Sequence, residues 1–174
     1  MGNDNELRIG KLQEKRIYTL IVNKYDDTID LPLDDANFVG RFTDLLRWLD
    51  TYEVEAQAKE KELEERFNGR TAVSEDKEGN TVVDMEFLEA RVNFNKTIYQ
   101  AIFDKVEGIF GKDSLKKYFR AQYERVPEFI PDEDAIGDFL EEITPVINTL
   151  YDTKMEYKRK RKARFGKYQK VYHK

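Results

Sequence analysis

The chain lacks cysteine and has one histidine, His173, one residue from the end of the sequence. Disulfide bonds, thiolate metal sites and cysteine nucleophiles are therefore excluded. A single histidine also excludes a histidine-based catalytic triad and a histidine-rich metal site. No run approaches the roughly 18 apolar residues of a membrane span. Residues 1–16 lack the apolar segment of a secretory signal. We therefore expect an intracellular protein with no membrane contact.

Motifs of catalysis are also scarce. The glycines do not cluster as a phosphate-binding loop requires, no serine lies in a nucleophile-elbow pattern, and no Glu-x-x-His pair occurs. Asp104 and Asp138 lie in apolar segments, where burial could raise the pKa of a general acid. Both fall on the polar side of a predicted helix, however, which favours solvated carboxylates. We predict that the protein is not an enzyme and that it holds no cofactor or metal.

What the chain has in excess is charge, and the two signs are separated. Its 174 residues include 35 acidic and 30 basic side chains. Residues 154–174 contain ten Lys or Arg and one acid, a net charge of +9, whereas residues 1–153 carry −14. The sequence thus predicts a single acidic domain over residues 1–153 and a basic tail over residues 154–174. The densest cations of this tail are Lys158, Arg159, Lys160, Arg161, Lys162 and Arg164.

Two short β-hairpins are predicted. Residues 17–22 are rich in β-branched and aromatic side chains, residues 23–27 favour a turn, and residues 28–31 alternate, which indicates a hairpin near the N-terminus. Residues 71–83 contain two short apolar strands around Gly79, which indicates a second, small hairpin. The segment from Ser74 to Gly79 also mimics part of a calcium-binding EF-hand loop, but Met85 stands where that loop needs a bidentate glutamate.

The rest of the chain is predicted to be helical, because apolar residues recur at three- and four-residue steps. The first long helix begins at Asp34 or Asp35 and ends at Asn68-Gly69. The second begins after Asp84, ends at Gly111 and forms the core. Its apolar stripe is Leu88, Val92, Tyr99, Ile102, Val106 and Ile109, widened by Phe87, Phe94, Ile98, Phe103 and Phe110. The last begins at Asp132, and we expect Pro145 to kink or split it. The predicted fold class is mainly α (α+β), a helical bundle with an N-terminal β-hairpin, a second small hairpin and a basic helical tail.

The basic tail allows more than one interpretation. Tyr157, Phe165, Tyr168 and Tyr172 alternate with its cations, and cations with aromatic side chains are what a nucleic-acid-binding tail needs. The acidic domain, however, would repel a polyanion, so nucleic acid is the less favoured partner. The alternative partner of the basic tail is an acidic protein surface, which could be the acidic domain of a second copy. A homo-oligomer is therefore left open.

Several short motifs follow one another in a fixed order. They are Phe-Asp-Lys-Val-Glu-Gly-Ile-Phe-Gly at 103–111, Leu-Lys-Lys-Tyr-Phe at 115–119, Pro-Asp at 131–132 and Phe-Leu-Glu-Glu-Ile-Thr-Pro at 139–145. Together with the N-terminal hairpin and the basic end, this order resembles the small tail assembly chaperones of long-tailed phages that infect Gram-positive bacteria. The resemblance extends over residues 17–164. Residues 53–83 form an extension that makes this chain longer than many members of that family.

The resemblance implies a function in virion assembly. Such chaperones bind the long helical tape measure protein in the host cytoplasm and keep it soluble while tail tube subunits are recruited. They are absent from the finished virion. The alternatives are a nucleic-acid-binding accessory protein that acts through the basic tail and a structural subunit of the virion. The residues that we expect to contact the tape measure protein are Trp48, Ala56, Leu63 and Phe67, although Trp48 could instead pack on the N-terminal hairpin.

Overall fold

The structure is a computed structural model that describes residues 18–33 and 35–171; beyond residue 160 it describes the side chain of Lys162 only. The expected fold class is confirmed, because the described chain is mainly helical with two small antiparallel hairpins. It divides into two compact units, Met1–Glu133 and Asp134–Lys174. The elements are β1 (Tyr18–Ile21), β2 (Thr28–Leu31), α1 (Ala36–Arg66), β3 (Val73–Glu75), β4 (Thr81–Val83), α2 (Met85–Phe110), α3 (Ser114–Tyr118), α4 (Arg120–Arg125) and α5 (Glu133–Val171).

Strands β1 and β2 form the N-terminal hairpin, with Tyr18 opposite Leu31 and Ile21 opposite Thr28. Ile29 and Leu31 are buried, so one face of this hairpin joins the core of the first unit. Ile17, which was predicted to begin the first strand, lies outside the described residues.

The turn of this hairpin is tied to α3 and α4 by polar contacts. Asn23 Nδ2 donates to the carbonyl oxygen of Lys117 at 2.6 Å, and Lys117 Nζ donates to the carbonyl oxygen of Thr28 at 2.9 Å. Arg120 Nη1 lies 3.1 Å from Asp27 Oδ2. The hydrogen bond from Asn23, followed by that from Arg120, lowers the pKa of Asp27 below its ordinary value. These groups hold together segments that are about ninety residues apart in the sequence.

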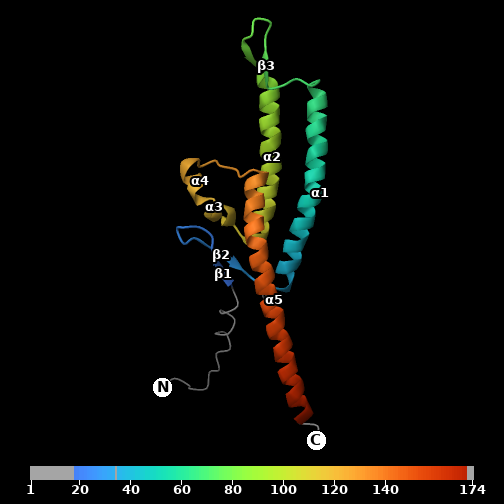
Figure 1. The fold of residues 1–174 in the computed structure, drawn as a ribbon, viewed down its shortest axis with the longest axis vertical. Helices are drawn as coiled ribbons and strands as arrows, with labels where there is room; N and C mark the ends of the chain where they lie inside the picture. Colours follow the sequence, from blue (N-terminus) through green and yellow to red (C-terminus); the bar gives the residue numbers. More distant parts are fainter. Residues whose placement is uncertain (1–17, 34, 172–174) are drawn as a thin grey trace, which may run out of the picture. The chain divides into compact units, whose positions relative to one another are not determined.

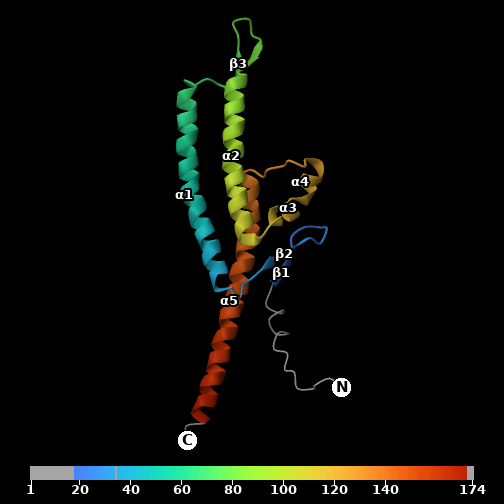
Figure 2. The same cartoon turned by 180° about the vertical axis from the view of Figure 1, so that it is seen from behind.

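Helices α1 and α2 form an antiparallel helical hairpin. They lie side by side in both views, and the β3–β4 hairpin connects their ends (Figures 1 and 2). Four contacts define their register: Phe42 with Phe110, Trp48 with Lys105, Glu60 with Arg91, and Phe67 with Phe87. The charged segment of α1 that follows Tyr52 therefore lies along the first half of α2, which gives the extension over residues 53–83 a definite structure.

The buried residues of α2 all belong to the predicted apolar set, but part of that set is exposed. Ile98, Ile102, Val106 and Phe110 are buried and recur at steps of four residues. Val92 was expected to face the core, but its side chain is 54% exposed. Periodicity indicates which residues share the apolar side of a helix, but not which of them a neighbouring element covers. The packing of α1 against α2 decides which of these apolar residues are buried.

The expected helix ends are largely confirmed. The Asp35 side chain accepts a hydrogen bond from the backbone N–H of Asn37, and that of Asp84 accepts one from Phe87, so each caps the start of a helix. Gly111 ends α2 with a φ of 98°, a conformation that side chains disfavour. The start of α3 is held by Glu107, whose carboxylate accepts hydrogen bonds from the backbone N–H groups of Asp113 and Leu115.

Helix α5 runs through Pro145 without interruption, so of the two expected outcomes, a kink or a split, the split does not occur. A proline costs a helix the hydrogen bond to the carbonyl four residues earlier. The Thr144 hydroxyl donates to the carbonyl oxygen of Leu140 at 2.5 Å, one residue before the carbonyl that loses its partner. The helix also passes residues 153 and 154 unbroken, so the basic tail continues it. The buried apolar side chains of α5 are Ile136, Phe139, Leu140, Ile143 and Ile147.

Candidate functional site

The acidic residues considered for catalysis lie in solvent. Asp104 is exposed and accepts a hydrogen bond from Gln100 Nε2 at 2.8 Å, and Asp138 is exposed on α5. Their expected location on polar helix faces is confirmed. Over residues 18–33 and 35–171, no group of three or more Asp, Glu, His or Cys side chains is placed to hold a metal ion.

The loop that mimics part of a calcium site is a tight turn. The Asp76 carboxylate accepts hydrogen bonds from the backbone N–H groups of Glu78 and Asn80 at 2.8 and 2.9 Å. The side chain of Asn80 donates to it as well, at 3.0 Å. These hydrogen bonds lower the pKa of Asp76 below its ordinary value, and the bond from the Asn80 side chain has the largest effect. The carboxylate thus stabilises the β3–β4 turn itself.

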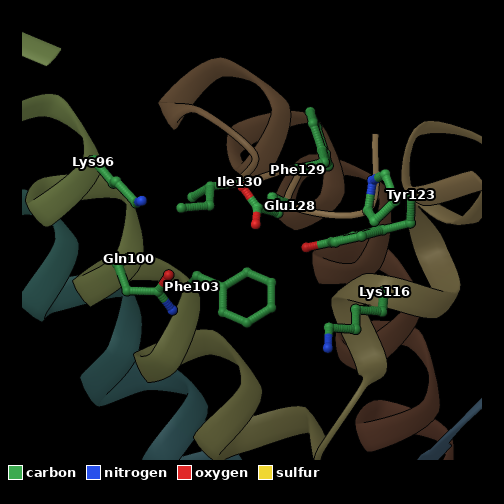
Figure 3. A pocket seen from close by; sticks show the side chains of 9 residues that line it. Lys96, Gln100, Phe103, Lys116, Tyr123, Glu128, Phe129 and Ile130 are labelled. Atoms are coloured by element: carbon green, nitrogen blue, oxygen red, sulfur yellow. The ribbon is translucent and has the colours of Figure 1, made fainter. Parts of the chain in front are cut away.

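A shallow cavity of about 370 Å³ lies between α2 and the segment from α3 to the loop after α4. Figure 3 shows the Lys96 ammonium, the Glu128 carboxylate and the Tyr123 hydroxyl directed toward the space between them. Burial, and then the charge of Glu107, raises the pKa of Tyr123, so this phenol remains a neutral hydrogen-bond donor. The other lining residues are Gln100, Phe103, Lys116, Pro127, Phe129 and Ile130.

The aromatic ring of Trp48 lies at the junction of α1 and α2. It stacks on Tyr52, with ring centroids 4.5 Å apart and an interplanar angle of 19°, and Lys105 Nζ lies 5.3 Å from the ring centroid. These contacts come from both helices of the hairpin, and the ring is half-buried. Part of this large apolar surface therefore stays open to solvent.

Ala56 and Leu63 continue this side of α1 and are also half-buried. On α2, Phe94 is half-buried, one turn beyond the Arg91 that contacts Glu60. We call Trp48, Tyr52, Ala56, Leu63 and Phe94 the seam of the α1–α2 hairpin. It is a row of apolar side chains that two helices cover only in part.

Phe67 is not part of this open surface, and the expectation that it offers an exposed contact is wrong. Its side chain is 4% exposed. It meets Phe87 edge-to-face with ring centroids 5.2 Å apart, and the guanidinium groups of Arg66 and Arg70 lie over its ring. The chain reverses just after α1, and this reversal encloses the side chain.

A second open apolar surface was not recognised in the sequence. All six residues of β3 and β4 are exposed. The sequence pattern marks their valines as strand formers, and the lack of a third predicted strand nearby is the signal that a face stays uncovered. The exposed apolar side chains of this region are Val73, Val82, Val83 and Met85.

The basic tail presents exposed cations on α5. Lys158, Arg159, Lys160 and Lys162 are exposed, and Lys160 Nζ lies 2.7 Å from Glu156 Oε1. Tyr157, between them, is 67% exposed. The side chains of Arg161 and Arg164 lie outside the described residues.

Comparison of the chain with protein-family models, with curated proteins and with solved structures finds no significant match. Within the described part of the chain, no helix combines the length and apolar character that crossing a membrane requires.

Proposed function

We propose that this protein is a phage tail assembly chaperone that holds amphipathic helices of the tape measure protein along the α1–α2 seam. The observation that carries the proposal is the half-exposed apolar row of Trp48, Ala56 and Leu63 on one side of a two-helix hairpin. A third helix laid on such a row completes the packing that two helices leave open. The order of motifs that resembles the tail assembly chaperones supports the same function.

The charge around the seam suits this role. Residues 50–66 contain seven acidic and three basic side chains, and most of them are exposed. Exposed like charge keeps a complex with an aggregation-prone helix in solution. It also selects for helices whose apolar stripe is flanked by cations. In this proposal the protein acts in the host cytoplasm, without catalysis or a cofactor, while tail tube subunits are recruited.

The coding DNA provides a first test. The proposal expects a very long reading frame just downstream, which encodes the tape measure protein. It also expects a slippery heptamer near the 3′ end of this gene, because many chaperones of the family that the chain resembles are made in a second, longer form by ribosomal frameshifting. The absence of both would contradict it. Mass spectrometry of purified particles separates the chaperone from a structural subunit, because a chaperone leaves before the particle is complete.

Co-expression with the tape measure protein from the downstream frame tests the seam. The wild type should keep that protein in the soluble fraction, and Ala56→Glu should lose this effect because it places a charge in the apolar row. Ala58→Glu is the matched control, since Ala58 lies two residues away on the exposed side of α1. The proposed site is wrong if the two variants, with equal helical content by circular dichroism, solubilise the client equally.

A further inference from the structure

The two hairpins that the structure describes differ in what covers them. The β1–β2 hairpin buries Ile29 and Leu31, whereas every residue of β3 and β4 is exposed. An isolated two-stranded hairpin is marginally stable in water unless one face is covered. The β3–β4 hairpin therefore presents an unpartnered sheet face.

The register separates this hairpin into two unlike faces. Val73 pairs with Val83 and Glu75 pairs with Thr81, so these four side chains share one face, and Val82 and Ser74 point to the other. Asp84 is extended, so the alternation returns Met85 to the side of Val83. Met85 is 58% exposed. We call Val73, Glu75, Thr81, Val83 and Met85 the tip face.

The tip face lies within a strongly acidic part of the molecule. Residues 50–89 contain thirteen acidic and five basic side chains, a net charge of −8. All of these acids except Glu60 and Asp84 are exposed. An occupant of the tip face must bring positive charge together with apolar side chains.

The basic tail of α5 has that composition. Residues 154–174 carry +9, which nearly balances the −8 around the tip face. The exposed Met155 and Tyr157 lie among its cations. We propose that the basic tail of one copy binds the tip face of a second copy. Opposite net charges draw the two segments together, and the valines and Met85 supply apolar contact for the tail.

The tail is part of α5, one uninterrupted helix from Glu133 to Val171, so it offers a second copy a preformed helical segment. Tail and tip face are different surfaces, so the contact is heterologous. Repeated from copy to copy, it builds rings or open arrays. This inference does not depend on the proposed client, since it concerns the chain alone.

Sedimentation equilibrium of the purified full chain without any client tests the inference. At about 50 mM salt the average mass should rise with concentration above the 20.7 kDa of one chain, and about 500 mM salt should abolish this rise, because salt screens exposed charges. Val83→Ser should weaken the self-association about tenfold. Val82→Ser is the matched control and should leave it unchanged, because both valines are 45% exposed on the same strand but face opposite ways.

A charge exchange identifies the partner. Lys158→Glu with Lys162→Glu, and separately Glu75→Lys with Glu78→Lys, should each abolish self-association, and mixing the two variants should restore a complex. Circular dichroism confirms that each variant keeps its helices. The inference is overturned if the wild type stays monomeric at low salt, as it would if the tail bound its own chain or only nucleic acid. It is equally overturned if Val82→Ser acts like Val83→Ser, or if the mixed variants stay apart.

Discussion

Arg91 on α2 donates a hydrogen bond from Nη2 to Glu60 Oε1 on α1 over 2.6 Å, and its Nη1 lies 3.6 Å from Glu64 Oε1. One guanidinium thus bridges two carboxylates that are a single helical turn apart. The bridge lies between Trp48 and Phe67. The buried side chains of α1 are Phe38, Phe42 and Leu45, which all precede this part of the helix. The Arg91 bridge therefore helps to set the register of the two helices where few apolar side chains are buried between them.

Replacing Arg91 with Ala should loosen this part of the hairpin. The side chain is 39% exposed, and pairs of this kind contribute about 0.5 kcal/mol each. Hydrogen exchange of residues 53–66 should become faster, while exchange at the buried end of α1 near Phe42 stays unchanged. Arg47→Ala is the control, because that side chain is 75% exposed and pairs with Asp44 on its own helix. Equal effects of the two variants would show that the bridge does not join the helices.

Two glycines should respond to alanine in opposite directions. A Cβ built on either Gly40 or Gly111 has no atom within 4 Å, so crowding does not distinguish them. Gly40 is in α1, and Gly40→Ala should stabilise the fold by about 0.5–1 kcal/mol. Gly111 has a φ of 98°, so Gly111→Ala should cost about 1–3 kcal/mol. Urea unfolding followed by circular dichroism measures both, and shifts of the same sign would contradict the assignment.

The pKa of Asp84 should depend on Arg70. The guanidinium hydrogen bond from Arg70, followed by the backbone N–H of Phe87, lowers this pKa below the ordinary value of 3.8. A carboxyl whose pKa is lower in the folded chain stabilises that chain at pH values above 3.8. This stabilisation is lost as the pH falls through the lower, folded-state pKa.

Arg70→Gln should therefore raise the pKa of Asp84 toward its ordinary value, as measured by a carbon NMR titration of the carboxyl. Asp76 is an internal control in the same spectra. Its pKa is also lowered, but by Asn80 and nearby backbone donors, so Arg70→Gln should leave it unchanged. A pKa shift of Asp76 equal to that of Asp84 would instead indicate a general change of the β3–β4 hairpin.

Trp48 should report the binding of a client helix directly. It is the only tryptophan, and its ring is half-buried between Tyr52 and Lys105. A helix laid on the seam would remove water from the ring, so the emission should shift to shorter wavelength and quenching by iodide should fall. Peptides that cover the amphipathic helices of the tape measure protein serve as ligands, and the same peptides with charged residues in their apolar stripe serve as controls. Unchanged emission on binding would place the client elsewhere.

Much of this architecture follows from local chemistry and was predictable. Asp35 and Asp84 begin helices because their side chains satisfy free N–H groups, and Gly79 and Gly111 lie where the backbone needs a positive φ. The exposed cations Lys158 and Lys162 also followed from the charge pattern alone. Such features depend on interactions within a few residues, which a single sequence displays.

The tertiary structure decided what depends on distant partners. Phe67 and Trp48 are both aromatic residues of the α1 segment, yet the first is enclosed by Phe87 and the second remains half-open beside Lys105. Arg120 reaches Asp27 across 93 positions of the sequence. Periodicity shows that a helix has an apolar side, but the burial of each residue on that side depends on which element packs there. For that reason the chain's own pattern determined its helices, hairpins and charge separation, and the pairing of α1 with α2 determined which apolar residues remain open to a partner.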